Sequence, residues 1–133
     1  MKARLLLDTC VLLDCLFDFK SISEKGKQWL KYDHNSLAIS VASIWEVGIK
    51  HFTHPENVPI SASELHNMLR DLNIEIVPIR AEYVRAIDVF LNEKIHKDPF
   101  DHILLATAAV GGYILMTKDE KVSQYRNANV VLI

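Results

Sequence analysis

Short, continuous apolar runs alternate along the chain with longer amphipathic segments. Runs that are apolar at successive positions are typical of strands covered on both faces. They predict strands at residues 5–7, 37–40, 74–78, 113–117 and 129–133. The longer segments predict helices at about 9–17, 21–32, 43–52, 61–72, 81–93, 98–110 and 119–125. Strands that alternate with helices predict an α/β fold with a mainly parallel sheet of about five short strands.

The segment at 96–108 contains a helix start that can be followed residue by residue. Asp98 is a good N-cap, because its carboxylate can accept from the free amides of the first turn. Pro99 suits the first helical position, where no amide donor is needed. Asp101 then lies in the first turn, where the helix dipole favours negative charge. The apolar residues that follow predict a helix packed against the sheet, with Asp101 at its rim.

Composition limits the class of protein. The chain has 133 residues, half of them apolar, and shows no repeat or linker, so we expect a single domain at 1–133. A net charge of −2 and a pI near 6.3 exclude a strongly basic nucleic-acid coat. The sequence shows no signal peptide or membrane-length apolar run, so we expect a cytoplasmic protein. Cys10 and Cys15 match no zinc or redox spacing and are expected to be buried thiols.

Four acidic residues stand where strands end or helices begin. Asp8 closes the first strand, Glu46 is expected in the first turn after the second strand, and Asp119 follows the fourth. The carboxyl ends of parallel strands form one edge of a sheet, where the sites of α/β proteins lie. Asp101 reaches that edge only if the connection before its helix crosses over it.

Clustered carboxylates favour one kind of chemistry. They raise each other's pKa unless a cation holds them, and Mg²⁺ prefers oxygen ligands. Bound cations can activate water and stabilise the attacking and leaving oxygens of a phosphodiester. The sequence has no Gly-rich phosphate loop and no HExxH motif. The acids therefore favour metal-dependent phosphodiester hydrolysis.

Four blocks of sequence carry a resemblance to a known family. They are LLLDTCVLL at 5–13, SVASIWEVGIK at 40–50, HKDPFDHILLATA at 96–108 and LMTKDEKV at 115–122. With these blocks the chain resembles PIN-domain ribonucleases, close to the VapC-type toxins of bacterial toxin–antitoxin pairs. The resemblance implies a three-layer α/β/α fold, dependence on Mg²⁺ or Mn²⁺, and an RNA substrate. It also implies a homodimer and a small antitoxin protein that blocks the site.

The same resemblance assigns roles to individual residues. Asp8, Glu46 and Asp101 match the family's core metal-binding acids, with Glu46 at a second cation or acting through water. Asp119 matches a fourth acid whose role is less uniform, and Thr117 matches a hydroxyl position near the site.

Two positions depart from the family pattern. Cys10 stands where related chains often have His, and His102 stands where Arg usually follows the DPFD motif. Neither change removes a carboxylate, so the resemblance implies an active enzyme.

Basic residues near the acid-bearing segments are candidates for contact with the RNA backbone. They are Lys50, Lys97, His102 and Lys118. A solvated charge is the simpler interpretation for each lysine, and His51, His54, His96 and His102 are also expected to be solvated. Trp29 and Trp45 are expected to pack in the core or in a dimer interface rather than to stack on bases.

Helix capping is the simpler alternative for several of the acids. Asp98 is fully explained as a cap, and Asp101 and Glu46 could each be the acid of a capping box that begins at Asp98 or Ser43. Asp119 could cap the helix predicted after it. Asp8 is harder to explain in this way, because a charge that closes an apolar strand needs solvent or a cation. Taken together, the acids favour a metal site.

Other functions remain open on the sequence alone. One is a PIN nuclease that processes RNA or DNA without a toxin role. A second is a phosphoacceptor domain of receiver type, which would need an acidic pair after the first strand and an Asp after the third. Asp8 stands alone, and the third strand ends at Val77 and Pro78. A third is a protein-binding domain in which the carboxylates are inert.

Overall fold

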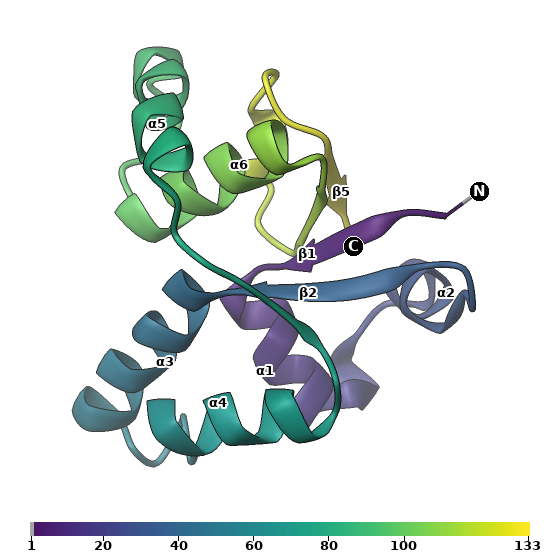
Figure 1. Cartoon of the computed structure of the whole chain (residues 1–133). Coiled ribbons are helices and arrows are strands. Elements are labelled where there is room, and N and C mark those ends of the chain that lie inside the picture. The colour runs from purple at the N-terminus through teal and green to yellow at the C-terminus, as the bar shows by residue number, and fades with distance from the viewer. Residues whose placement is uncertain (1) are drawn as a thin grey trace.

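The computed structural model describes residues 2–133 and is built around a five-stranded sheet in which each neighbouring pair is parallel (Figure 1). The strands are β1 (Arg4–Leu7), β2 (Ser36–Ser40), β3 (Glu75–Val77), β4 (Ile114–Thr117) and β5 (Val130–Leu132). All five predicted strands are present, and the parallel sheet is confirmed.

The order of the strands, β3-β2-β1-β4-β5, creates a switch point beside β1. The chain runs outward from β1 to β3 and then returns to the other side of β1 for β4 and β5. Connections therefore leave β1 and β4 in opposite directions, which opens a crevice at their carboxyl ends. Leu7 is aligned with Met116, and the amide of Asp8 donates to the carbonyl of Met116 at 3.0 Å. Asp8 and Thr117 thus leave the sheet side by side.

Helices cover both faces of the sheet. They are α1 (Thr9–Phe17), α2 (Glu24–Lys31), α3 (Val41–Thr53), α4 (Ala62–Asp71), α5 (Ala81–Glu93) and α6 (Pro99–Gly111), with short 3-10 turns η1 (Phe19–Ser21) and η2 (Val122–Gln124). Helices α1, α3 and α4 lie on one face and α5 and α6 on the other (Figure 1). The three-layer α/β/α arrangement is confirmed, but the helix predicted at 119–125 is only the turn η2.

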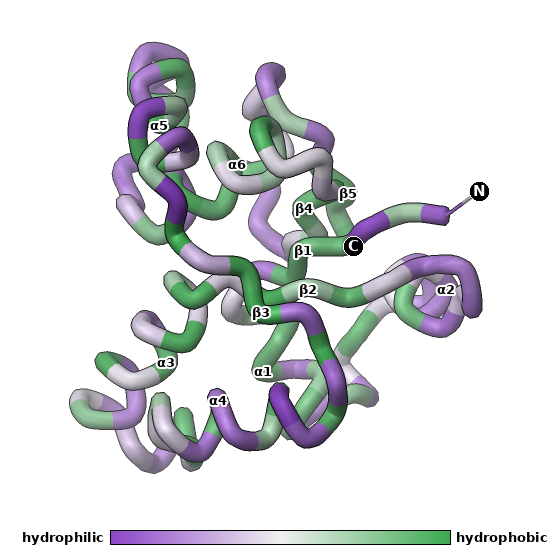
Figure 2. Tube along the Cα trace, viewed as in Figure 1, coloured by the Kyte–Doolittle hydropathy of each residue, from purple (hydrophilic) through white to green (hydrophobic). Residues whose placement is uncertain are grey.

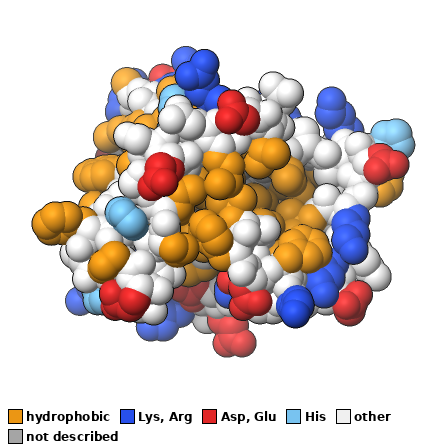
Figure 3. Space-filling view, turned by 90° about the horizontal axis from the view of Figure 1, so that it is seen from below, with side chains coloured by type: hydrophobic (Ala, Val, Ile, Leu, Met, Phe, Trp, Pro, Cys, Tyr) orange, Lys and Arg blue, Asp and Glu red, His pale blue; other side chains and the backbone are white. Residues whose placement is uncertain are grey.

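Alternation along β1 divides the hydrophobic core in two. Leu5 and Leu7 belong to the cluster beneath the sheet and Leu6 to the cluster above it, because successive side chains of a strand point to opposite faces. Figure 2 shows the hydrophobic strands at the centre and the more mixed helices outside. Hydrophobic side chains also gather in a hollowed area on the outer surface of the α1, α3 and α4 layer (Figure 3).

The start of α6 follows the sequence prediction. Asp98 is the N-cap, its Oδ1 accepts from the amide of Phe100 at 2.9 Å, and Pro99 is the first helical residue. The helix ends at Gly112, whose φ of 77° lies in the left-handed region that favours glycine.

The start of α3 differs from the prediction. The helix begins at Val41 rather than Ser43, because Ser40 is the cap and its Oγ accepts from the amide of Ala42 at 3.0 Å. Ser43 is buried inside the helix. Glu46 therefore lies in the second turn, and its interpretation as the acid of a capping box is wrong.

Two expectations from composition can be compared with the structure. Cys10 and Cys15 are both free thiols, but Cys10 is exposed and Cys15 half-buried, so the expected burial is wrong. Within residues 2–133, no helix combines the length and the apolar character needed to span a membrane.

Candidate metal centre

The acids predicted from the sequence converge in one cleft of about 250 Å³ at the carboxyl edge of the sheet. It is lined by Asp8, Thr9, Cys10, Glu46, Lys50, His96, Asp98, Asp101, Lys118 and Asp119. Asp8 follows β1, Glu46 projects from α3, and Asp119 follows β4. Asp101 reaches the same cleft because the connection between α5 and α6 brings the first turn of α6 to this edge.

Asp8 is buried and held at both carboxylate oxygens. Its Oδ1 accepts from the amide of Val11 at 2.9 Å and so caps α1, while its Oδ2 accepts from the hydroxyl of Thr117 at 2.5 Å. Burial raises the pKa of Asp8, and the two hydrogen bonds oppose that rise. Thr117 thus contacts Asp8 directly.

Glu46 is held by a hydroxyl and a lysine. Its Oε1 accepts from the hydroxyl of Thr9 at 2.6 Å, and its Oε2 lies 3.0 Å from Nζ of Lys50, one turn further along α3. The side chain of Glu46 is 13% exposed. Thr9 was not among the predicted site residues, although its position directly after Asp8 is the signal that could have identified it.

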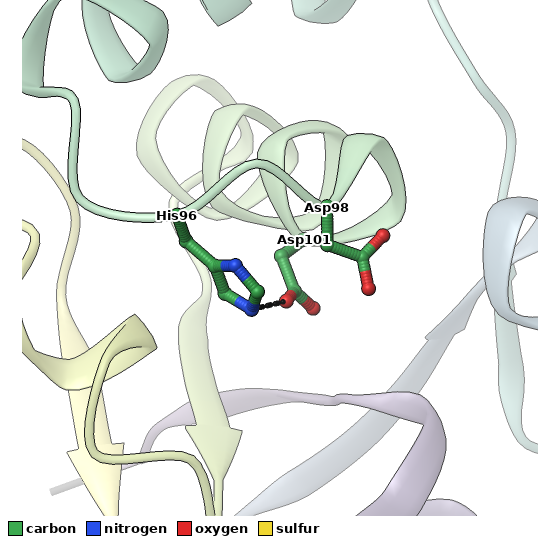
Figure 4. A group of neighbouring side chains, drawn as sticks. All are labelled: His96, Asp98 and Asp101. Carbon is green, nitrogen blue, oxygen red and sulfur yellow. Dashed lines mark ion pairs between the residues drawn. The ribbon is translucent and has the colours of Figure 1, made fainter.

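Asp101 lies among like charges. Burial, and then the carboxylates of Asp98, Asp8, Glu46 and Asp119, raise its pKa to about 7. Within residues 2–133, a short contact to this carboxylate comes from His96, whose Nε2 lies 3.0 Å from Oδ2 of Asp101 (Figure 4). One ligand atom from each of His96, Asp98 and Asp101 lies within 4.8 Å of the others, so Asp98 faces the cleft as well as capping α6.

Asp119 has two sets of contacts. Its Oδ1 accepts from the amide of Lys121 at 2.8 Å, which accounts for a local turn, and its Oδ2 lies 3.5 Å from Nε2 of His96. Its own amide donates to Oγ1 of Thr117 at 3.0 Å. The helix that Asp119 was expected to cap is only the turn η2, whose N-cap is Lys121 without a side-chain cap, so capping does not explain Asp119. One of its oxygens closes a local turn and the other faces the cleft.

The basic residues divide into two groups. Lys50 and Lys118 line the acidic cleft, and Lys118 is also ion-paired with Asp14, a contact that the sequence did not suggest. Lys97 is exposed and borders a neighbouring hollow instead. His102 is only 5% exposed, so the structure disfavours both its predicted solvation and a direct contact with RNA.

Several aromatic and histidine side chains also differ from expectation. His96 contacts acids rather than solvent alone, and His51 is half-buried with Nδ1 2.7 Å from the carbonyl of Val58. Trp29 packs against the lower core as expected. Trp45 lies outside the core, because it is 59% exposed and makes an edge-on contact with Phe100, so of its two expected places only a dimer interface remains.

The donor set fits a hard divalent cation. Asp8, Glu46, Asp98, Asp101 and Asp119 supply carboxylate oxygens to a single cleft, and only Lys50 and Lys118 bring fixed positive charge to its lining. Burial first, and then the neighbouring carboxylates, raise the pKa of Asp101, and a bound cation would offset both effects. Such a set suits Mg²⁺ or Mn²⁺, which take oxygen ligands and retain water.

Comparisons with known proteins give a family and a fold. A family model described as the PIN domain matches residues 5–128. Similar solved structures include VapBC2 from Rickettsia felis bound to a DNA fragment from its promoter, with 15% identity, 98% of each chain covered and a TM-score of 0.71. A toxin–antitoxin complex from Klebsiella pneumoniae has 23% identity and a TM-score of 0.63, with 95% of this chain and 94% of that chain covered.

A third similar structure is VapBC-5 from Mycobacterium tuberculosis, with 16% identity, a TM-score of 0.64, and coverage of 98% of this chain and 99% of that chain. At these identities the likeness concerns the fold alone. Curated protein sequences give no match.

Proposed function

The chain belongs to the PIN-domain family, and from this premise we propose that it is a metal-dependent endoribonuclease of the VapC toxin type. The observation that carries the proposal is the convergence of Asp8, Glu46, Asp101 and Asp119 in one cleft at the switch point of the sheet. In this proposal the whole chain, residues 1–133, is a single nuclease domain that acts in the cytoplasm.

Each acid has a proposed role. Asp8 and Asp101 would hold the cation, Glu46 would bind a second cation or act through water, and Asp119 would complete the set. When bound, Mg²⁺ or Mn²⁺ would activate water and neutralise charge at the phosphodiester. Thr117 and Thr9 keep the carboxylates of Asp8 and Glu46 aimed into the cleft.

The substrate is proposed to be RNA. Lys50 and Lys118 line the cleft and are placed to attract the phosphates on either side of the bond that is cut. Lys97 borders the neighbouring hollow, so it would contact the RNA only beyond the cleft.

We further propose that the protein is a homodimer and binds a small antitoxin. The similar structure from Klebsiella pneumoniae is a toxin–antitoxin complex, and VapBC-5 from Mycobacterium tuberculosis belongs to a family of toxin–antitoxin systems, which supports such a partner. The surface supports it as well, because α1 and α3 carry exposed Phe17, Trp45, Ile49 and Phe52. Hydrophobic side chains gathered on the outer surface of the α1, α3 and α4 layer are typical of protein interfaces (Figure 3).

Removing single carboxylates tests the proposed reaction. Asp8→Asn and Asp101→Asn are each expected to lower RNA cleavage in Mg²⁺ or Mn²⁺ by more than about a hundredfold, since each removes a charged ligand. Both variants should keep the wild-type circular dichroism spectrum, and EDTA should abolish wild-type cleavage. Asp33→Asn is the matched control, because Asp33 is exposed in a turn at the opposite edge of the sheet.

The results separate the alternatives. Cleavage of RNA by Asp8→Asn at the wild-type rate would refute the nuclease assignment. RNA cleavage without growth arrest on expression in bacteria would instead favour RNA processing without a toxin role. A DNA substrate cut in preference to RNA would favour DNA processing. A receiver-type phosphoacceptor has no structural support, because β3 ends at Val77 and Pro78 follows it, so no acid stands at the carboxyl end of this strand.

A further inference from the structure

Two buried polar side chains converge on the backbone of His96. Nε2 of His102 lies 2.7 Å from the carbonyl oxygen of His96, and the hydroxyl of Tyr125 accepts from the His96 amide at 2.8 Å. The same hydroxyl donates to the His96 carbonyl at 3.2 Å. His102 comes from α6 and Tyr125 from the end of η2, so residue 96 is held from two separate elements.

The buried polar atoms of His102 and Tyr125 need hydrogen-bond partners. His102 and Tyr125 are only 5% and 3% exposed, and buried polar groups are unfavourable unless they are hydrogen-bonded. Both side chains form hydrogen bonds with the backbone of His96 and, at 3.5 Å, with each other. The two side chains therefore fix the position of one loop residue, and this accounts for the histidine that follows the DPFD motif.

The backbone clamp also fixes the direction of the His96 ring. Its Nδ1 accepts from the amide of Lys97 at 3.0 Å, so the neutral ring carries its proton on Nε2. That Nε2–H faces the carboxylates, 3.0 Å from Oδ2 of Asp101 and 3.5 Å from Oδ2 of Asp119. Figure 4 shows the ring turned toward the carboxylate of Asp101.

We propose that His96 is a positioning residue of the metal centre, and that His102 and Tyr125 act through it. By donating to Oδ2 of Asp101, His96 restrains that carboxylate and leaves the other oxygen, Oδ1, for the cation. It also links Asp101 on α6 with Asp119 after β4, two acids that lie on separate elements. Hydrogen-bond partners of metal ligands contribute to affinity in this way, typically by ten- to a hundredfold. The inference rests on the proposed metal-dependent function.

Titration with Mn²⁺ alone, followed by calorimetry, tests the role of His96. His96→Ala is expected to weaken Mn²⁺ binding by ten- to a hundredfold, because Asp101 loses its donor. His96→Gln should recover much of that loss, since the amide nitrogen of glutamine can occupy the place of Nε2. If His96 had only a structural role, His96→Gln would not recover Mn²⁺ affinity in this way. Thermal unfolding of each variant shows whether the fold is retained.

A double-mutant cycle tests the clamp. Tyr125→Phe keeps the ring and removes only the hydroxyl that holds the His96 backbone, so it should weaken Mn²⁺ binding by several-fold in the wild type. In the His96→Ala background the same change should have no further effect, because there is no imidazole left to position. His102→Gln provides a second variant of the clamp.

The outcomes distinguish this inference from the proposed function. If wild type binds Mn²⁺ and His96→Ala binds it equally well, the positioning role is wrong while the metal-dependent function stands. If Tyr125→Phe lowers Mn²⁺ affinity equally in wild type and in His96→Ala, the clamp does not act through His96. If the folded wild type binds no Mn²⁺, both the function and the inference fail.

Discussion

Thr117 and Asp8 are 109 residues apart in sequence, yet the hydroxyl of Thr117 donates to the carboxylate of Asp8 at 2.5 Å. The contact follows from the pairing of β1 with β4, in which Leu7 lies opposite Met116. The same hydroxyl accepts from the amide of Asp119. One buried threonine therefore orders two acids of the cleft, on both sides of the switch point.

Replacing this hydroxyl should weaken cation binding. In Thr117→Val the side chain keeps its shape but Asp8 loses a donor that lowers its pKa, so the pKa of Asp8 should rise further above its usual range. Mn²⁺ affinity at neutral pH should fall by roughly tenfold, as for other lost hydrogen bonds to metal ligands. Calorimetric titration measures the change, and RNA cleavage should fall with it.

Thr117→Ser is the matched control, because serine keeps the donor and loses one methyl group. It should bind Mn²⁺ nearly as well as wild type. If valine and serine variants bind Mn²⁺ equally, the hydroxyl does not order Asp8 in the way described.

The raised pKa of Asp101 should appear in the pH dependence of stability when divalent cations are absent. Its pKa is about 7 in the folded chain and 3.8 in the reference state, so between these values the folded state binds more protons than the unfolded state. The contribution of Asp101 to the free energy of unfolding therefore falls as pH rises from about 4 to about 7. Urea denaturation in EDTA at several pH values measures this slope.

Asp101→Asn isolates the effect, because asparagine does not titrate. The variant should be the more stable of the two above pH 7, and the difference should shrink toward pH 4. Adding Mn²⁺ above pH 7 should stabilise wild type but not the variant. Identical pH profiles for the two proteins would contradict the raised pKa.

Lys50 should contribute to RNA affinity through its charge. It lines the cleft, and in Lys50→Ala both this charge and the ion pair with Glu46 are lost. RNA binding, measured by fluorescence anisotropy in EDTA so that no cleavage occurs, should weaken. The slope of log affinity against log salt should fall by about 0.7, the value for one contact with a single-stranded phosphate.

Lys25→Ala is the control for net charge. Lys25 is exposed on α2 and does not line the cleft. The Lys25→Ala variant should leave the slope of log RNA affinity against log salt concentration unchanged. A slope that changes equally in both variants would mean that only the overall charge matters, and Lys50 would then have no place in the RNA interface.

Much of the local structure could be predicted from the sequence, because it depends on residues that are close together in the chain. The cap at Asp98 with Pro99 in the first helical position is an interaction within one helical turn, and it is present. The start of α3 could not be predicted so well, because Ser40 and Ser43 are both suitable caps. Strand β2 passes directly into the helix, so no turn residues marked which serine was used.

Taken alone, the sequence determined the alternation of strands and helices and the chemical type of the site, since apolar runs and carboxylates are properties of single segments. The arrangement of the site was decided by tertiary structure. The contact of Thr117 with Asp8 requires β4 to pair with β1, and the clamp on His96 requires α6 and η2 to meet across the loop after α5. These contacts join residues far apart in sequence, and only the order of strands and the packing of helices bring them within hydrogen-bond distance.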